Sequence, residues 1–185
     1  YDPEEAKKLL EESGWTDTDG DGYVDKDGQK LSINWLTYPT RLEQPKLAEY
    51  AQATLKDIGI DVVVNNTSDH MTIAKNGDFD VYVSSTTTAP TGDPEYFFTS
   101  TVTGAKNYGN YQNEEVTKLT DQLHQTFDKD ERSKLAVELQ QDILDDDAFF
   151  FVSHLNMGIV TKSNVKGMAA HPCDYYEITA DLDVE

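Results

Sequence analysis

Cysteine is almost absent from this chain: a single residue, Cys173, stands among 185. No disulfide can therefore form within the chain, which excludes the small secreted domains that disulfides hold together, although one cysteine does not identify the cellular compartment. Long apolar runs are also missing, and no stretch approaches the roughly 20 residues of a membrane-spanning helix. Residues 1–10 lack the features of a signal peptide, so we expect the sequence to begin within a longer protein.

Basic residues are scarce, with 15 Lys and Arg against 35 Asp and Glu, and the formal net charge is −20 at pH 7. Binding to a phosphate backbone needs the opposite sign, so this balance argues against nucleic acid as a partner and against docking on an anionic membrane. The sequence also lacks a G-x-S-x-G elbow, a P-loop, an H-E-x-x-H zinc motif and a complete dinucleotide fingerprint. The four histidines are scattered, with none spaced as a metal-ligand pair. These absences give no support for an enzyme or for a catalytic cofactor, and we expect neither.

What the sequence does contain is an alternation of strand and helix patterns over its first half. Residues 31–38 alternate between polar and apolar side chains, which predicts a strand, and residues 47–58 carry the apolar face of a helix. A second strand is expected over 60–64, a short helix over 71–75, and a third strand over 79–83. This order predicts an α/β fold, mainly a parallel sheet with right-handed crossovers and flanking helices.

The second half begins with two helix patterns. Capping residues at Asn113 and Asp128 precede apolar faces, which predicts an αα-hairpin whose first helix turns Phe127 inward. The apolar runs 148–152 and 157–160 are predicted strands. Residues 165–185 show no hydrophobic period, so this tail is expected to pack on something outside the sequence.

The most specific local motif covers residues 17–25, DTDGDGYVD. Carboxylates at positions 1, 3, 5 and 9, with Gly at position 6, match the first nine positions of a calcium-binding loop, although position 12 is Gly28 where a bidentate Glu would complete it. Crowded carboxylates repel one another without a cation, whereas Asp-Gly pairs also form plain polar turns. We hypothesise a structural Ca²⁺ held by the side chains of Asp17, Asp19 and Asp21, the carbonyl of Tyr23, and Asp25 directly or through water.

Hydroxyl side chains follow the predicted strand 79–83. Because adjacent parallel strands end at one edge of a sheet, Tyr38 and Thr86 are expected to emerge on the same side. Hydroxyls can both donate and accept hydrogen bonds, which suits a small polar solute; the alternative is a solvated loop. We predict a ligand-binding edge formed by Tyr38, Thr86, Thr87, Thr88 and Thr91.

Several segments, in the same order, resemble the C-terminal half of the family 5 extracellular solute-binding proteins, the oligopeptide, dipeptide and nickel receptors of ABC importers. The resemblance is carried by YDPEEAKKLLEESGWTDTDGDGYVDKDGQKL, LKDIGIDV, GDFDVYV, GDPEYFF, NYGNYQNEEV and VKGMAAHP. It implies a periplasmic-binding-protein-like type II fold, with residues 1–162 as the second α/β lobe and 163–185 as a tail that returns to the first lobe. It also implies an extracytoplasmic location, periplasmic or as a cell-surface lipoprotein, and delivery of the solute to a membrane permease.

The resemblance further implies that the loop after strand 79–83 faces the ligand cleft. Peptide-binding members similar to this chain carry a Trp there and, shortly after, an Asp that pairs with the peptide α-ammonium, whereas this chain has TTTAP at 86–90. The Ala-Pro-x-x-Asp-Pro pattern resembles the nickel branch, but that branch's metal-contacting His has no counterpart between Thr99 and Tyr111. The hydroxyls would suit the carboxylates of a chelate or a sugar equally well. A nickel or other metal chelate is favoured over a short peptide. The competing class is an independent calcium-binding interaction module, although such modules usually repeat the loop and this chain has one copy.

Overall fold

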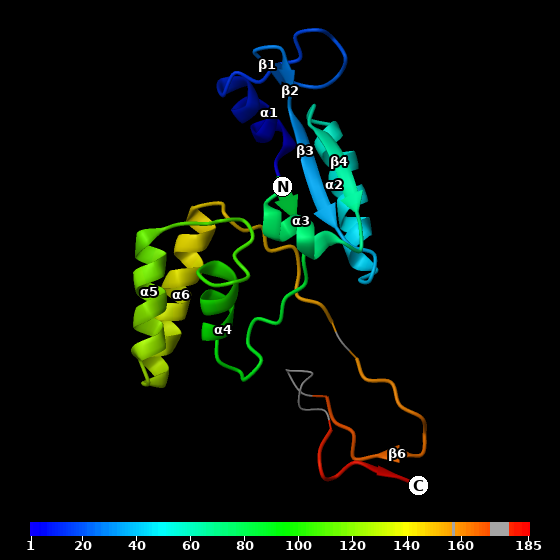
Figure 1. The fold of residues 1–185 in the computed structure, drawn as a ribbon, viewed down its shortest axis with the longest axis vertical. Coiled ribbons are helices and arrows are strands. Elements are labelled where there is room, and N and C mark those ends of the chain that lie inside the picture. Colours follow the sequence, from blue (N-terminus) through cyan, green and yellow to red (C-terminus); the bar gives the residue numbers. More distant parts are fainter. Residues whose placement is uncertain (157, 171–177) are drawn as a thin grey trace. The chain divides into compact units, whose positions relative to one another are not determined.

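The computed structural model describes residues 1–156, 158–170 and 178–185. The chain forms two compact units, Tyr1–Ser85 and Thr86–Glu185, and each is described by itself (Figure 1). Across the described ranges, no helix has the combined length and apolar character needed to cross a membrane.

A three-stranded parallel sheet organises the first unit. The strand order is β4-β3-β5, with β3 (Ser32–Thr37) between β4 (Asp61–Asn66) and β5 (Val81–Tyr82). The crossovers are α2 (Glu43–Lys56) and α3 (His70–Asn76), so the predicted parallel α/β arrangement is confirmed.

The strand β5 is shorter than the predicted 79–83, and at its start a side chain replaces a backbone acceptor. The Asp80 carboxylate accepts the Asn34 backbone N–H at 2.7 Å, a donor that a strand carbonyl would otherwise bind. Backbone bonds from Asp80 N to Asn34 O and from Val83 N to Leu36 O nevertheless continue the contact with β3 on both sides of the two strand residues.

The core of the first unit lies between α2 and the sheet. Ala48 of α2 is fully buried, as are Leu36 of β3 and Val62 of β4. The turn that joins α2 to β4 requires glycine, since Gly59 has φ +83° and a Cβ there would lie 2.9 Å from Val24 Cγ1. The turn therefore packs closely against Val24, the residue just before β1.

Two small elements precede the sheet. The helix α1 (Pro3–Glu12) begins where the Asp2 carboxylate accepts the Glu5 N–H at 3.0 Å, as an N-cap should. The strands β1 (Asp25–Lys26) and β2 (Gln29–Lys30) form an antiparallel hairpin.

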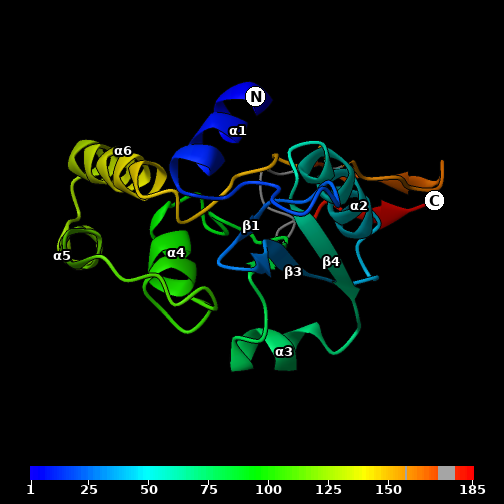
Figure 2. The ribbon, with the colours of Figure 1, turned by 90° about the horizontal axis from the view of Figure 1, so that it is seen from above.

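Helices form the core of the second unit. After α4 (Glu95–Phe97) and the π-helical turn η1 (Phe98–Val102), α5 (Glu114–Gln125) and α6 (Lys129–Asp145) pack side by side as the predicted hairpin (Figures 1 and 2). The predicted caps are present, because Asn113 and Asp128 each accept two backbone N–H groups. The buried cluster consists of Phe98, Val102, Val116, Leu119, Leu123, Leu135, Ala136, Leu139 and Ile143.

Two predictions for this unit are wrong. Phe127 is 92% exposed, because α5 ends at Gln125 and the extended backbone of Thr126 takes Phe127 off the helix face. Residues 148–156 and 158–160 contain no strand, and Met157 lies outside the described residues. An apolar run favours a strand, but a strand also needs a neighbour to bond, and these residues make no ladder with any described strand. Several of their apolar side chains are uncovered, with Phe150 88% exposed, whereas Phe149 packs against the buried cluster.

The expected tail contains one short antiparallel pair within its described residues. This pair consists of β6 (Val165–Lys166) and β7 (Asp183–Val184).

Candidate functional site

Three rings meet at the carboxyl edge of the sheet in the first unit. Tyr38 directly follows β3, His70 lies four residues beyond the end of β4, and Tyr82 ends β5, so each ring comes from the carboxyl end of a different parallel strand. The ring of His70 stacks on that of Tyr38, with centroids 4.1 Å apart and planes 19° apart. His70 Nδ1 lies 2.8 Å from the Tyr82 hydroxyl. We call Tyr38, His70 and Tyr82 the carboxyl-edge cluster.

The segment that follows β5 is held by hydrogen bonds to two of its backbone groups, Val83 O and Ser85 N. Gln44 of α2 is 3% exposed, and its amide, in the orientation that satisfies both groups, donates to Val83 O at 3.0 Å and accepts from Ser85 N at 3.2 Å. The Tyr38 hydroxyl also accepts from Ser85 N, at 3.3 Å. Ser85 is therefore fixed within the first unit. It comes immediately before residues 86–92, which we call the hydroxyl loop.

The four predicted threonines begin the second unit. Thr86, Thr87, Thr88 and Thr91 are all exposed, and none of their hydroxyls forms a hydrogen bond within the described ranges. Their hydroxyls are thus accessible to a solute. The structure places Tyr38 against Ser85, one residue before Thr86, and a joint site of Tyr38 with the threonines stays a prediction.

An arginine holds the far end of the hydroxyl loop within the second unit. Arg132 of α6, whose side chain is 15% exposed, binds the Asp93 carboxylate through Nε at 3.0 Å and Nη2 at 2.7 Å. Its Nη2 also lies 2.7 Å from Glu95 Oε2. Its Nη1 donates to the carbonyls of Leu123 and Thr126 at the end of α5. One guanidinium therefore ties together the start of α4, the end of α5 and the first turn of α6.

The charges in this network stabilise one another. Hydrogen bonds from Arg132 lower the pKa of Asp93 below its ordinary value. The pKa of Glu95 is lowered as well, mainly by its hydrogen bond with His124 and then by that with Arg132. The two carboxylates in turn raise the pKa of Arg132, so the guanidinium stays charged.

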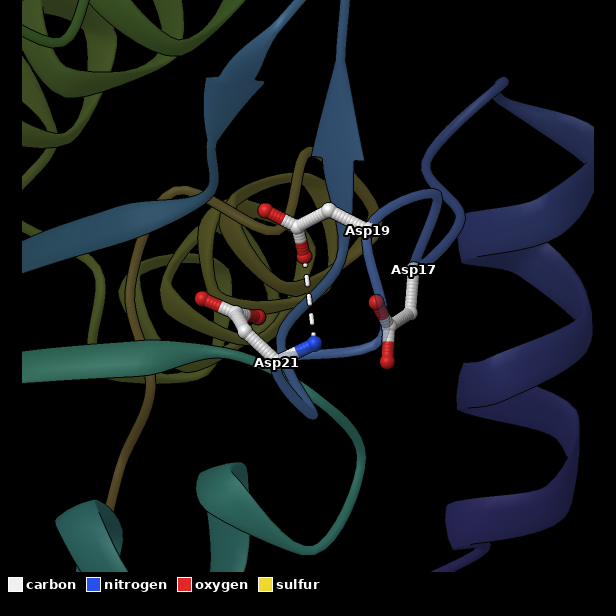
Figure 3. Close-up of side chains that lie close together, drawn as sticks. All are labelled: Asp17, Asp19 and Asp21. Carbon is white, nitrogen blue, oxygen red and sulfur yellow. Dashed lines mark hydrogen bonds between the residues drawn. The ribbon is translucent and has the colours of Figure 1, made fainter.

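The acidic loop brings three of its predicted ligands together. One carboxylate oxygen from each of Asp17, Asp19 and Asp21 lies within 4.8 Å of the other two (Figure 3). Backbone donors orient these groups: Asp17 accepts from Gly20 N at 2.7 Å and from Gly22 N at 3.0 Å, and Asp19 accepts from Asp21 N at 3.1 Å. All three carboxylates are exposed, and oxygen ligands of this kind are the ones that Ca²⁺ prefers.

The other two predicted ligands are not part of this cluster. The Asp25 carboxylate accepts from the backbone N–H of Thr18 at 2.9 Å and from its hydroxyl at 2.7 Å, bonds that lower the pKa of Asp25. Tyr23 donates its backbone N–H to the Asp21 carboxylate at 2.8 Å. The ligand roles of the Tyr23 carbonyl and of Asp25 stay predictions.

Sequence reasoning missed the residues that hold the edge, although a signal for them existed. His70 and Tyr82 each follow or end a parallel strand, the same criterion that selected Tyr38. Arg132 is one of only two arginines in a strongly acidic chain, so a dedicated carboxylate partner could have been expected. The sequence around Gln44 did not indicate its role, because that role depends on hydrogen bonds to Val83 and Ser85, far along the chain.

Comparison with known proteins gives a consistent result. Residues 1–109 match the family described as "Bacterial extracellular solute-binding proteins, family 5 Middle". The oligopeptide-binding protein AppA of Bacillus subtilis is 31% identical over 184 residues, which cover 96% of this chain and 34% of AppA. The nickel-binding protein NikA of Staphylococcus aureus is 28% identical over 185 residues, covering 98% of this chain and 36% of NikA. The chain thus spans about a third of the length of these relatives.

A solved structure agrees with the sequence matches. NikA from Staphylococcus aureus in complex with Ni(L-His)₂ has a TM-score of 0.76 and 26% identity, over 100% of this chain and 38% of that one. The fold is therefore that of a type II periplasmic binding protein.

Proposed function

Since the chain belongs to the bacterial extracellular solute-binding proteins of family 5, we propose that it is the second lobe of a receptor that captures a small polar solute and passes it to the permease of an ABC importer. In this proposal residues 1–162 form the lobe, residues 163–185 return to the first lobe, and the receptor works outside the cytoplasm. The observation that carries the proposal is the family match over residues 1–109, which include the parallel sheet and the hydroxyl loop at its carboxyl edge. The family is a class of binding proteins and not of enzymes.

We propose a metal chelate as the solute, in preference to a short peptide. A peptide α-ammonium needs a carboxylate partner, and residues 86–92 contain none. The first carboxylate after them, Asp93, already binds Arg132 through both oxygens and accepts the Glu95 N–H at 2.9 Å. The exposed hydroxyls instead suit the carboxylates of a chelate. Relatives of both kinds exist, since AppA binds oligopeptides and NikA binds nickel.

Titration calorimetry of the full-length receptor tests this preference. We expect tight binding of Ni²⁺ mixed with L-histidine and weak binding of di- and oligopeptides. Tight peptide binding that is lost when the peptide amino terminus is acetylated would overturn the preference for a chelate.

The hydroxyl loop should contribute directly to the affinity. Replacing both Thr87 and Thr88 with Ala in the full-length receptor should weaken binding by about 0.5–1.5 kcal/mol for each hydrogen bond lost. The matched control is Thr117→Ala on α5, whose hydroxyl bonds its own helix at Asn113 O. An unaltered affinity in the double variant, or an equal loss in the control, would remove the loop from the site.

We also propose that the acidic loop holds a structural Ca²⁺ ion through Asp17, Asp19 and Asp21. An ion that binds only the folded state raises the melting temperature as its concentration rises. Millimolar Ca²⁺ should therefore raise the melting temperature relative to a chelator, and Asp19→Asn should reduce the effect. A melting curve that does not respond to Ca²⁺ would contradict the site, and Asp121→Asn, which removes one exposed carboxylate from α5, is the matched control.

A further inference from the structure

The imidazole of His70 is held in a defined orientation by two neighbours. One ring face stacks on Tyr38, which is 8% exposed, with centroids 4.1 Å apart. Its Nδ1 is fixed at 2.8 Å from the Tyr82 hydroxyl. Across the described residues the second nitrogen, Nε2, has no hydrogen-bond partner, and it is not among the buried unpartnered atoms. One nitrogen is therefore anchored, while the other is unpaired among the described residues and not fully buried.

The contact with the Tyr82 hydroxyl allows the ring tautomer that metal binding needs. The 2.8 Å contact fits either ring tautomer; in the tautomer with the proton at Nδ1, Nδ1–H donates to the Tyr82 hydroxyl, whose own proton can point toward Met71 Sδ at 3.9 Å. A neutral imidazole protonated at Nδ1 presents a lone pair at Nε2. Metal-binding histidines have this arrangement, because the ring N–H that is not at the metal is held by an outer partner.

The net charge of the chain and the position of the His70 ring both favour a metal ion as the ligand of Nε2. A chain with net charge −20 attracts cations and repels anions, so a metal ion is favoured over a carboxylate at an open nitrogen. Neutral imidazole suits nickel, copper and zinc. The ring also lies at the carboxyl edge of a parallel sheet, where open α/β folds bind their ligands.

We propose that His70 Nε2 coordinates the metal ion of a chelate that keeps at least one exchangeable coordination position. The inference rests on the proposed capture of a metal chelate and adds the protein ligand. In the sequence His70 lies outside residues 99–111, so the metal contact would come from a different segment of the chain than in the receptors that this sequence resembles.

The test uses the full-length receptor with two nickel probes. Ni²⁺ with one equivalent of L-histidine keeps exchangeable positions, whereas Ni²⁺ with EDTA leaves few or none. The variant His70→Phe keeps a ring to stack on Tyr38 but has no nitrogen, and His154→Phe is the matched control because His154 is exposed in a segment without regular structure. Melting curves of each variant confirm that it folds.

We expect His70→Phe to lower the affinity for the histidine chelate by about ten-fold or more, the scale seen when support for a metal is removed. The affinity for the EDTA chelate should change less than two-fold, and His154→Phe should change neither. The visible absorption of Ni²⁺ should shift when the histidine chelate binds the unchanged receptor, and this shift should be absent in His70→Phe.

Two outcomes separate this inference from the function on which it rests. The role of His70 would be overturned if His70→Phe left histidine-chelate binding unaltered, or if it weakened the binding of both probes equally. The proposed chelate function would still stand. A receptor that binds neither probe but binds peptides tightly would overturn the proposed chelate function and this inference with it.

Discussion

Replacing Arg132 with Gln is expected to destabilise the second unit by about 2–4 kcal/mol, one of the largest effects of any single substitution in this chain. The change leaves Asp93 without its cation, Glu95 with His124 alone, and two carbonyls at the end of α5 without their donor. The expected value lies below that of a fully buried pair, because the Asp93 side chain is 40% exposed and water screens it. Urea denaturation measures the difference. The matched control is Lys134→Gln, which removes the same charge from an exposed position on the same helix and should cost less than about 1 kcal/mol.

The pH dependence identifies the source of this effect. Asp93 and Glu95 have lowered pKa values when folded, against ordinary values of 3.8 and 4.5. Groups of this kind contribute stability that is fully present above the ordinary pKa and is lost as the pH falls through the folded pKa. The difference between the unchanged protein and Arg132→Gln should therefore be largest near neutral pH and shrink below about pH 4. A difference that stays constant down to pH 2 would show that lost packing, and not the ion pairs, causes the destabilisation.

Truncating Leu139 to Ala is expected to cost about 2–5 kcal/mol, because the change leaves a cavity in the only large apolar cluster of the described second unit. Leu139 is fully buried between α5 and α6, whereas Leu144 on the same helix is 49% exposed. Leu144→Ala should cost less than about 1 kcal/mol and serves as the control. Similar losses in the two variants, measured by urea denaturation, would mean that the α5–α6 core is not packed as the structure has it.

Local chemistry made much of the fold predictable. The helix starts at Asp2, Asn113 and Asp128 were correct because an N-cap bonds groups only two or three residues away. The parallel sheet followed from strand patterns that alternate with helix patterns. The predicted strand at 148–152 failed for the opposite reason: its apolar residues favour pairing, but whether they pair depends on a neighbour that no local pattern reveals.

The candidate site was predictable only in part for the same reason. The rule that parallel strands end at one edge selected Tyr38, and the spacing of Asp17, Asp19 and Asp21 predicted a cluster that the structure contains. The contact of Arg132 with Asp93 joins residues 39 positions apart, and that of Tyr38 with Ser85 joins residues 47 apart. Such contacts depend on the assembled fold, and the local sequence around one residue does not identify its distant partner.

The attachment of the loop at residues 86–92 bears on how such a receptor can diversify. The groups that hold its two ends, Gln44 and Tyr38 on one side and Arg132 on the other, all lie outside the loop. The exposed threonines within it make no side-chain hydrogen bond in the described residues, so exchanging them should cost little stability. If the proposed ligand site is correct, natural variation at these positions would change which solutes bind, while selection for a folded lobe acts elsewhere.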